Sequence, residues 1–166
     1  VGNTGAVHAF EIDPRPLRCL LRNAKTCKNG NIIIYEIAVS DDDAGGYLQA
    51  GKDCGHSSLR INGDGKKVAT TTLGQWADTC NNLVRIDVIK LDIEGGEERA
   101  LLGARDLIAN YRPKIICEAL DSGNDQNQIP GQKRLVKLLQ SMNYSVSFAA
   151  EVHSPTIVGL PDDLSI

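Results

Sequence analysis

The stretch "RIDVIKLDIEGGEERALLGARDLIANY" (residues 85–111) changes its hydrophobic period half-way along. Residues 85–93 form a nearly continuous apolar run, which is typical of a strand buried in a parallel sheet. Residues 96–111 repeat apolar side chains at helical spacing and predict one helix. Between the two periods lie three acids and a glycine pair: Asp92, Glu94, Gly95, Gly96 and Glu97. Acids at a strand-to-helix turn are what a ligand site at the edge of a sheet would need.

The rest of the chain alternates in the same way. Further strands are predicted at 6–11, 31–40, 114–120, 144–150 and 155–160, and helices at 13–25, 72–80 and 132–142. Asp13 and Pro14 are a typical N-cap and first turn, and Trp76 is expected to pack under its short helix. Residues 41–70 read as a long loop with a short hairpin. This order predicts an α/β fold with a mostly parallel sheet, in a single domain over residues 1–166.

Composition excludes several classes of protein. The 166 residues carry a net charge of -3, so neither nucleic acid nor an anionic membrane is an expected partner. No apolar run approaches the roughly 18 residues of a membrane span, and the N-terminal residues lack the pattern of a signal peptide. The five cysteines are widely spaced, without a CxxC pair. They predict reduced thiols in the cytoplasm, with Cys117 buried as a small hydrophobic residue.

Acidic side chains follow three of the predicted strands. Glu11 ends the first, Asp92 and Glu94 follow the strand at 85–93, and Glu118 ends the next. A carboxylate at the end of such a strand can accept hydrogen bonds from both hydroxyls of a ribose. Asp92 can face a ligand's ammonium group or orient a substrate hydroxyl. We therefore predict a nucleoside-binding site at this edge of the sheet.

Five ordered segments carry a resemblance to a known family: "GAVHAFEIDPRPLRCLLRNAK", "IAVSDDD", "TLGQWAD", "DVIKLDIEGGEERALLGARDLI" and "RPKIICEAL". Together they resemble the FkbM-type S-adenosylmethionine-dependent methyltransferases over residues 1–144. The resemblance implies a Rossmann-like class I methyltransferase fold. It also implies methyl transfer to a hydroxyl of a sugar or small natural product, with S-adenosyl-L-methionine as cofactor.

The resemblance also assigns roles to particular residues. Glu11, with Ile12 beside it, matches the acid that binds the ribose, and Ala38, Val39 and Ser40 match the segment that lines the adenine. His56, Ser57 and Ser58 lie in a stretch that faces the active site in the family. The candidate catalytic residues are Asp92, Glu94 and His56, as bases for the acceptor proton; Asp92 or Glu94 would need a pKa raised by desolvation. Asp92 also borders the methionine end of the cofactor.

Metal and partner expectations follow from the same residues. The "DIEGGE" segment lacks the dense oxygen spacing of a dedicated cation cage, so no metal is predicted. The expected partner is a small-molecule or glycan acceptor. An exposed sheet edge would favour a homo-oligomer.

One family motif has no counterpart in the sequence. A strand and a D-x-G-x-x-x-G turn should precede Val1. Three explanations stand open: the sequence is a fragment, which we expect; the strand at 6–11 pairs directly with 85–93, or a strand comes from another copy; or the chain is a relative that no longer binds the cofactor. The alternative function is a non-catalytic Rossmann-like module that binds a nucleotide or a partner. An NAD-dependent enzyme would need a G-x-G-x-x-G turn, which the chain does not contain.

Overall fold

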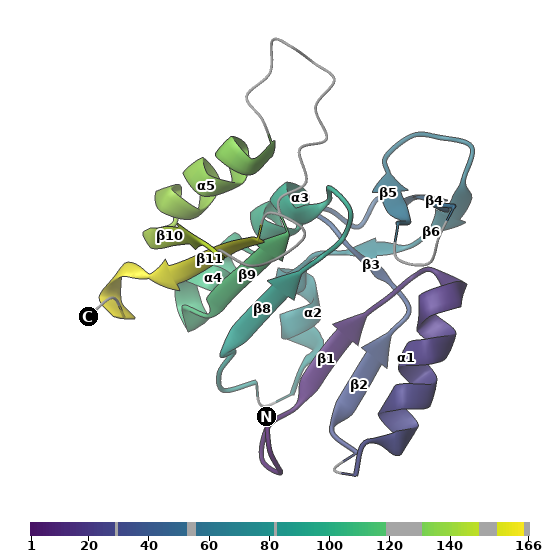
Figure 1. Ribbon diagram of the computed structural model, residues 1–166, viewed down its shortest axis with the longest axis horizontal. Helices are drawn as coiled ribbons and strands as arrows, with labels where there is room; N and C mark the ends of the chain where they lie inside the picture. The colour runs from purple at the N-terminus through teal and green to yellow at the C-terminus, as the bar shows by residue number, and fades with distance from the viewer. Residues whose placement is uncertain (29, 53–55, 82, 119–130, 150–155, 165–166) are drawn as a thin grey trace.

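The computed structural model describes residues 1–28, 30–52, 56–81, 83–118, 131–149 and 156–164 (Figure 1). The strands are β1 (Val7–Phe10), β2 (Ile32–Tyr35), β3 (Ala38–Val39), β4 (Gly46–Gln49), β5 (Ser58–Arg60), β6 (Lys66–Val68), β7 (Thr70–Thr71), β8 (Val88–Leu91), β9 (Lys114–Glu118), β10 (Tyr144–Phe148) and β11 (Thr156–Pro161). The helices are α1 (Pro14–Thr26), α2 (Leu73–Thr79), α3 (Glu97–Leu102), α4 (Arg105–Tyr111) and α5 (Gly131–Ser141), with a 3-10 turn at Asp162–Leu164.

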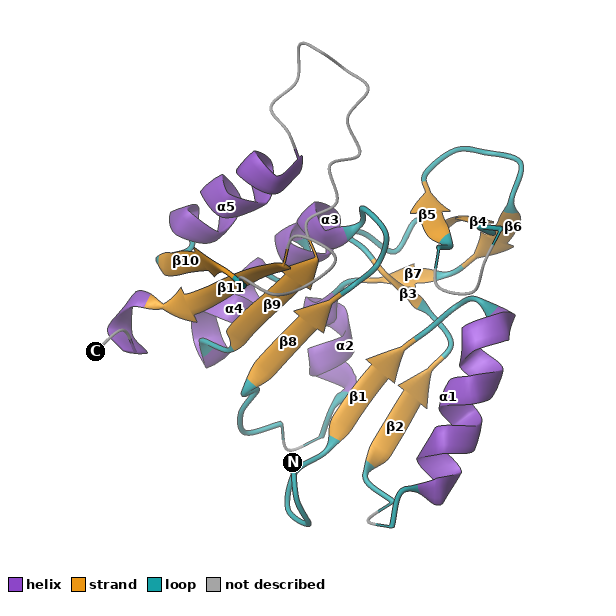
Figure 2. Cartoon of the chain, in the orientation of Figure 1, coloured by secondary structure: helices purple, strands orange, loops and turns teal. Residues whose placement is uncertain are grey.

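These strands pair into four separate sheets (Figure 2). The largest has the order β10-β11-β9-β8; its β8–β9 pair is parallel and its other two pairs are antiparallel. The pairs β1–β2 and β3–β7 are parallel, and β5-β4-β6 is antiparallel. The α/β class is therefore confirmed, whereas a single, mostly parallel sheet is not. The strand expected at 155–160 lies inside the largest sheet, between β9 and β10.

No backbone hydrogen bonds join β1 to β8 in the part of the chain that the structure describes. Among the described residues, β1 bonds only to β2 and β8 only to β9, so direct pairing of the two strands, one of the explanations left open, is not found. Figure 2 draws the arrows of β2, β1 and β8 pointing the same way. Val7 and Val88, one on each strand, are 40% and 51% exposed, as expected for side chains at open edges.

One hydrophobic core joins the helices to the largest sheet. It gathers residues of α2 to α5 with β8, β9, β10 and β11, and Phe10 and Tyr35 of the β1–β2 pair pack against it. Trp76 of α2 is buried, as predicted, and makes edge contacts with the rings of Phe10, Tyr35 and His8. A capping box between Thr72 and Gln75 fixes the start of α2.

The helix predicted over 96–111 is two helices, α3 and α4, with a break at Gly103 and Ala104. The cause is the backbone that follows β3. A Cβ on Gly103 would clash with the carbonyl oxygen of Ser40 and lie 2.9 Å from the Cα of Asp41. The chain therefore ends α3 where the two backbones touch, and α4 begins at Arg105. Sequence periodicity does not report such a contact.

Replacing Gly103 with alanine is expected to lower the free energy of unfolding by about 2 kcal/mol, because Ser40 is buried and cannot move aside. Urea denaturation measures the change. Gly74→Ala in α2 is the control, since a Cβ there meets nothing closer than 3.5 Å. It should be neutral or slightly stabilising. Equal losses for the two variants would contradict the packing described here.

Three smaller findings complete the fold. The 41–70 stretch, expected as a loop with a hairpin, contains the β5-β4-β6 sheet. Cys117 is fully buried, as predicted, and burial raises the pKa of its thiol to about 12; Cys19, Cys27 and Cys80 are also free thiols. None of the helices in the described ranges has the length and apolar character that crossing a membrane requires.

Candidate functional site

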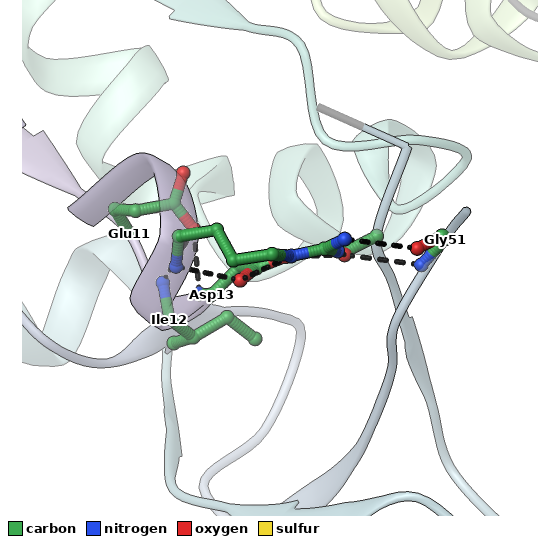
Figure 3. A network of polar contacts seen from close by, with 6 residues as sticks. Glu11, Ile12, Asp13 and Gly51 are labelled. Carbon is green, nitrogen blue, oxygen red and sulfur yellow. Dashed lines mark hydrogen bonds and ion pairs between the residues drawn. The ribbon is translucent and has the colours of Figure 1, made fainter. Parts of the chain in front are cut away.

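The junction between β1 and α1 is built around Asp13 (Figure 3). This buried carboxylate accepts hydrogen bonds from the Arg15 amide at 2.9 Å and the Arg15 guanidinium at 2.7 Å, and from the Ser57 hydroxyl at 2.5 Å. Arg15 also donates to the carbonyl of Gly51 at 3.0 Å. The Arg15 guanidinium holds the pKa of Asp13 well below its usual range. Asp13 therefore caps α1 and fastens it to the loop before β5.

Glu11 turns one carboxylate oxygen towards the backbone. Its Oε1 accepts from the amides of Ile12 and Asp13, both at 2.7 Å. In Figure 3 its other oxygen points away from these contacts, and within the described part of the chain that oxygen has no partner. The predicted ribose-binding acid is thus held in place by one oxygen, and the other can accept from a ligand. Ile12 takes part through its backbone amide.

The turn between β8 and α3 is shaped by Glu97. Its buried carboxylate accepts from the amides of Ile93 at 2.9 Å and Gly95 at 3.3 Å. Glu94 and Gly95 both have a positive φ, of 55° and 95°, so the chain reverses sharply here. The acid that the sequence places in the first turn of the helix thus also satisfies backbone donors of the turn.

Three carboxylates converge beside this turn. The parallel register pairs Leu91 of β8 with Cys117 of β9, so the next residues, Asp92 and Glu118, are neighbours. With Glu94 they offer ligand oxygens that all lie within 4.8 Å of one another. Asp92 is exposed, and the other two are partly buried. The predicted convergence of strand-end acids is therefore found for β8 and β9.

This cluster offers the oxygen ligands that a hard cation takes. Linear spacing could not include Glu118, which arrives from a different strand. The expectation that the chain binds no metal stays a prediction.

The pKa of Asp92 is lowered, not raised. Lys90 donates to its carboxylate at 2.6 Å. This hydrogen bond, with a further one from Glu118, lowers the pKa of Asp92. The idea that desolvation raises the pKa of Asp92 towards that of a general base is therefore wrong. Asp92 stays ionised near neutral pH and is suited to facing a cation or orienting a hydroxyl.

Replacing Lys90 with glutamine is expected to raise the pKa of Asp92 towards that of an ordinary aspartate, because the hydrogen bond and the positive charge are both lost. An NMR titration of the side-chain carboxyl carbon measures the midpoint. Arg85→Gln removes an equal charge from an exposed pair with Asp87 and should leave the midpoint of Asp92 unchanged. A midpoint that Lys90→Gln does not move would show that Lys90 does not control this carboxylate.

The predicted adenine segment lies next to the same turn. Val39, Ser40, Gly95, Gly96 and Arg99 line a pocket of about 50 Å³. Ser40 is buried; its hydroxyl donates to Asp41 at 3.1 Å and accepts from Arg99 at 3.1 Å. Ala38 is buried in β3. The structure thus brings Val39 and Ser40 beside the glycine pair, in a pocket that is smaller than an adenine ring.

The loop before β5 contains the predicted residues His56 and Ser57. Ser57 bonds to Asp13, and Ser58 begins β5 and pairs with Gln49. His56 is exposed, and no contact between described residues joins it to Asp92 or Glu94. Glu11 and Asp92 line neither the pocket beside Ser40 nor a larger cavity between α1 and the β5-β4-β6 sheet. A single site containing Glu11, His56 and Asp92 therefore stays a prediction.

Sequence reasoning missed two arginines that organise these loops. Arg15 links α1 to Gly51 and Ser57, and Arg99 of α3 forms ion pairs with Asp41 at 2.5 Å and Asp42 at 3.3 Å. The run of acids at 41–43 is the sequence signal for the second pairing, because neighbouring negative charges favour a nearby cation.

Two comparisons with known proteins agree with this arrangement. The family described as "Methyltransferase FkbM domain" matches residues 1–146. The crystal structure of a methyltransferase FkbM from Methylobacillus flagellatus KT is similar, with a TM-score of 0.59 and 17% identity. The similarity covers 93% of this chain and 36% of that one, so this chain spans about a third of its length. No curated protein matches the chain significantly. The chain belongs to the FkbM methyltransferase family.

Proposed function

We propose that the protein transfers a methyl group from S-adenosyl-L-methionine to a hydroxyl of a sugar or small natural product. The observation that carries this is the convergence of Asp92, Glu94 and Glu118 at one strand end. They lie beside a turn whose glycines also meet the predicted adenine segment. Ligands of α/β proteins bind at such strand ends. We also propose a cytoplasmic setting, supported by the four free thiols of the described residues.

We further propose that the paired strands are parts of one Rossmann-like sheet, with a further strand between β1 and β8. Three observations support this. The pairs β1–β2 and β8–β9 are both parallel. Phe10 and Tyr35 pack against the same core as Ile89 and Leu91. Trp76 has a buried indole N–H without a partner among the described residues, which an added polar group nearby would satisfy.

The residues of the site fit such a cofactor in two respects. The second oxygen of Glu11 is positioned to accept from ribose hydroxyls, and its first oxygen is fixed by two amides. Ionised Asp92 lies where a positively charged group can be held. When bound, the cofactor supplies an electrophilic methyl group, so the protein's task is to align the acceptor and remove its proton.

Different residues of the chain orient the acceptor, remove its proton and hold the turn. Asp92 orients the acceptor hydroxyl by accepting its hydrogen bond. The candidate bases are Glu94 and His56. Glu94 has a positive φ and lies in the turn between β8 and α3. Glu97 keeps the turn closed through its two backbone contacts, so that Asp92 and Glu94 stay together.

A second candidate function is a non-catalytic nucleotide- or partner-binding module. It is favoured by the edges of β1 and β8, which stay open among the described residues. Both candidates bind at the same strand ends, so binding and methyl transfer have to be measured separately.

Calorimetric titration with S-adenosylhomocysteine tests the proposal. It is run on the 166-residue chain and on a form extended by any residues that its gene encodes before Val1. Glu11→Gln should weaken binding about tenfold, because a charged acceptor is lost. Glu36→Gln is the control, since Glu36 is an exposed acid that follows β2 as Glu11 follows β1. Absence of binding by both forms would refute the methyltransferase proposal, and binding without methyl transfer to any hydroxyl acceptor would favour the second candidate.

A further inference from the structure

A second, larger cavity lies between the start of α1 and the β5-β4-β6 sheet. It has a volume of about 810 Å³ and its polar lining includes Arg15, Tyr47, Gln49, Arg60, Asp64 and Lys66. Cavities that hold small molecules have volumes of about 300–1,000 Å³. This groove therefore has room for a sugar-sized ligand, which the pocket of about 50 Å³ beside Ser40 does not.

The groove carries more positive than negative charge when the ion pair within it is left out. Of its five titratable groups with a formal charge, Asp13 and Arg15 neutralise each other. Arg60, Lys66 and Asp64 remain, which leaves one positive charge in excess. The Arg60 Nε donates to Gln49 at 3.2 Å, and its terminal amino groups have no partner among the described residues. Lys66 makes no ion pair or side-chain hydrogen bond within the described ranges.

The sheet register places an aromatic ring next to one of these cations. Tyr47 of β4 lies directly opposite Arg60 of β5, so both side chains are on the same face. Lys66 lies opposite Leu48, the residue after Tyr47, so its side chain starts from the other face of the sheet. A flat ring beside a guanidinium is suited to a ligand with an apolar face and an anionic substituent, which describes a charged sugar.

The groove also reaches the carboxylate turn. Arg60 lines both this groove and the small pocket beside Gly95 and Gly96. A ligand anchored at Arg60 can therefore extend towards the turn that carries Asp92 and Glu94.

We propose that this groove binds the acceptor and selects a polyol that carries an anionic group, such as a phosphate or a carboxylate. Arg60 binds the anion through its terminal guanidinium nitrogens, and Tyr47 covers the sugar ring. The assignment as acceptor site rests on the proposed methyl transfer. The binding preference itself rests only on the groove.

Binding of three sugars to the full chain tests this proposal: glucose 6-phosphate, glucuronate and glucose. Calorimetry gives the affinities, and amide chemical shifts in NMR spectra locate the ligand. The two anionic sugars should bind at least five times more tightly than glucose, and raised salt should weaken them. Their signals should shift at Tyr47, Gln49 and Lys66.

Arg60→Gln should weaken the anionic sugars about fivefold, since it removes a charge-assisted hydrogen bond. Lys66→Gln should have a smaller effect, because its side chain starts from the other face of the sheet. Lys25→Gln is the matched control, because Lys25 lies in the last turn of α1, at the opposite end from Arg15. Both groove residues are exposed, so the variants should fold normally, which circular dichroism checks.

Three results would overturn the proposal: equal or absent binding of the three sugars, shifts away from the groove, or an equal loss in Lys25→Gln. The outcome is independent of the S-adenosylhomocysteine titration. Sugar binding without cofactor binding would support the groove as a sugar site and contradict the proposed methyl transfer. Cofactor binding without sugar binding would support the methyl transfer and contradict the groove proposal.

Discussion

Replacing Asp13 with alanine is expected to lower the free energy of unfolding by about 3 kcal/mol. The variant loses the N-cap of α1, which contributes about 1 kcal/mol. It also leaves Arg15 and Ser57 without their buried acceptor, and breaking a buried pair from one side costs about 3–5 kcal/mol. Because the Arg15 side chain is 32% exposed, water recovers part of that loss. Chemical denaturation followed by circular dichroism measures the change.

The same carboxylate gives the stability a definite pH dependence. Its pKa is depressed in the folded state, so its stabilisation is fully present above the pKa of an unfolded aspartate, about 3.9. The stabilisation falls as the pH drops below that value. Asp13→Asn should therefore differ most from the native chain at neutral pH and approach it in acid. Asp106→Ala, an exposed acid in the first turn of α4, is the control and should cost less than about 1 kcal/mol. A constant difference between Asp13→Asn and the native chain from pH 6 to pH 2 would contradict this account.

Replacing Glu97 with alanine is expected to cost about 2–3 kcal/mol and to abolish ligand binding at the carboxylate turn. The amides of Ile93 and Gly95 lose their acceptor within a buried turn, and an unsatisfied buried donor costs about 1–3 kcal/mol. The turn then no longer holds Glu94 at a positive φ. Denaturation and S-adenosylhomocysteine titration measure the two effects.

Glu98→Ala is the matched control for this prediction. Glu98 is the next residue of α3 and forms a half-exposed ion pair with Arg134 at 2.9 Å. Its loss should cost less than about 1 kcal/mol and leave binding unchanged. Glu97→Gln keeps an acceptor oxygen and should recover part of the stability. If Glu97→Ala and Glu98→Ala behave alike, Glu97 does not shape the turn.

Local patterns in the sequence predicted most of the elements and one half of the site. Continuous apolar runs located β2, β8 and β9, and the Asp13–Pro14 pair located the start of α1. Parallel pairing of β8 and β9 then brings Asp92 to Glu118, as expected from acids that follow consecutive parallel strands. These features depend on residues near one another in the chain or on a simple register.

Features that depend on distant contacts could not be predicted. The break at Gly103 comes from the backbone of Ser40, about 60 residues away, which no periodicity encodes. The antiparallel position of β11 in the largest sheet depends on pairing with β9, about 40 residues earlier in the chain. In each case a spatial neighbour overrides the local signal.

The central claim is that the carboxylates following β1 and β8 serve one nucleoside-bearing methyl donor. An amide NMR map of S-adenosylhomocysteine binding to the full chain tests it most directly, because it reports every strand end at once. The account predicts that Glu11, Val39, Ser40, Asp92 and Gly95 shift together and saturate at the same ligand concentration. Shifts confined to one of these strand ends, or none at any of them, would contradict it.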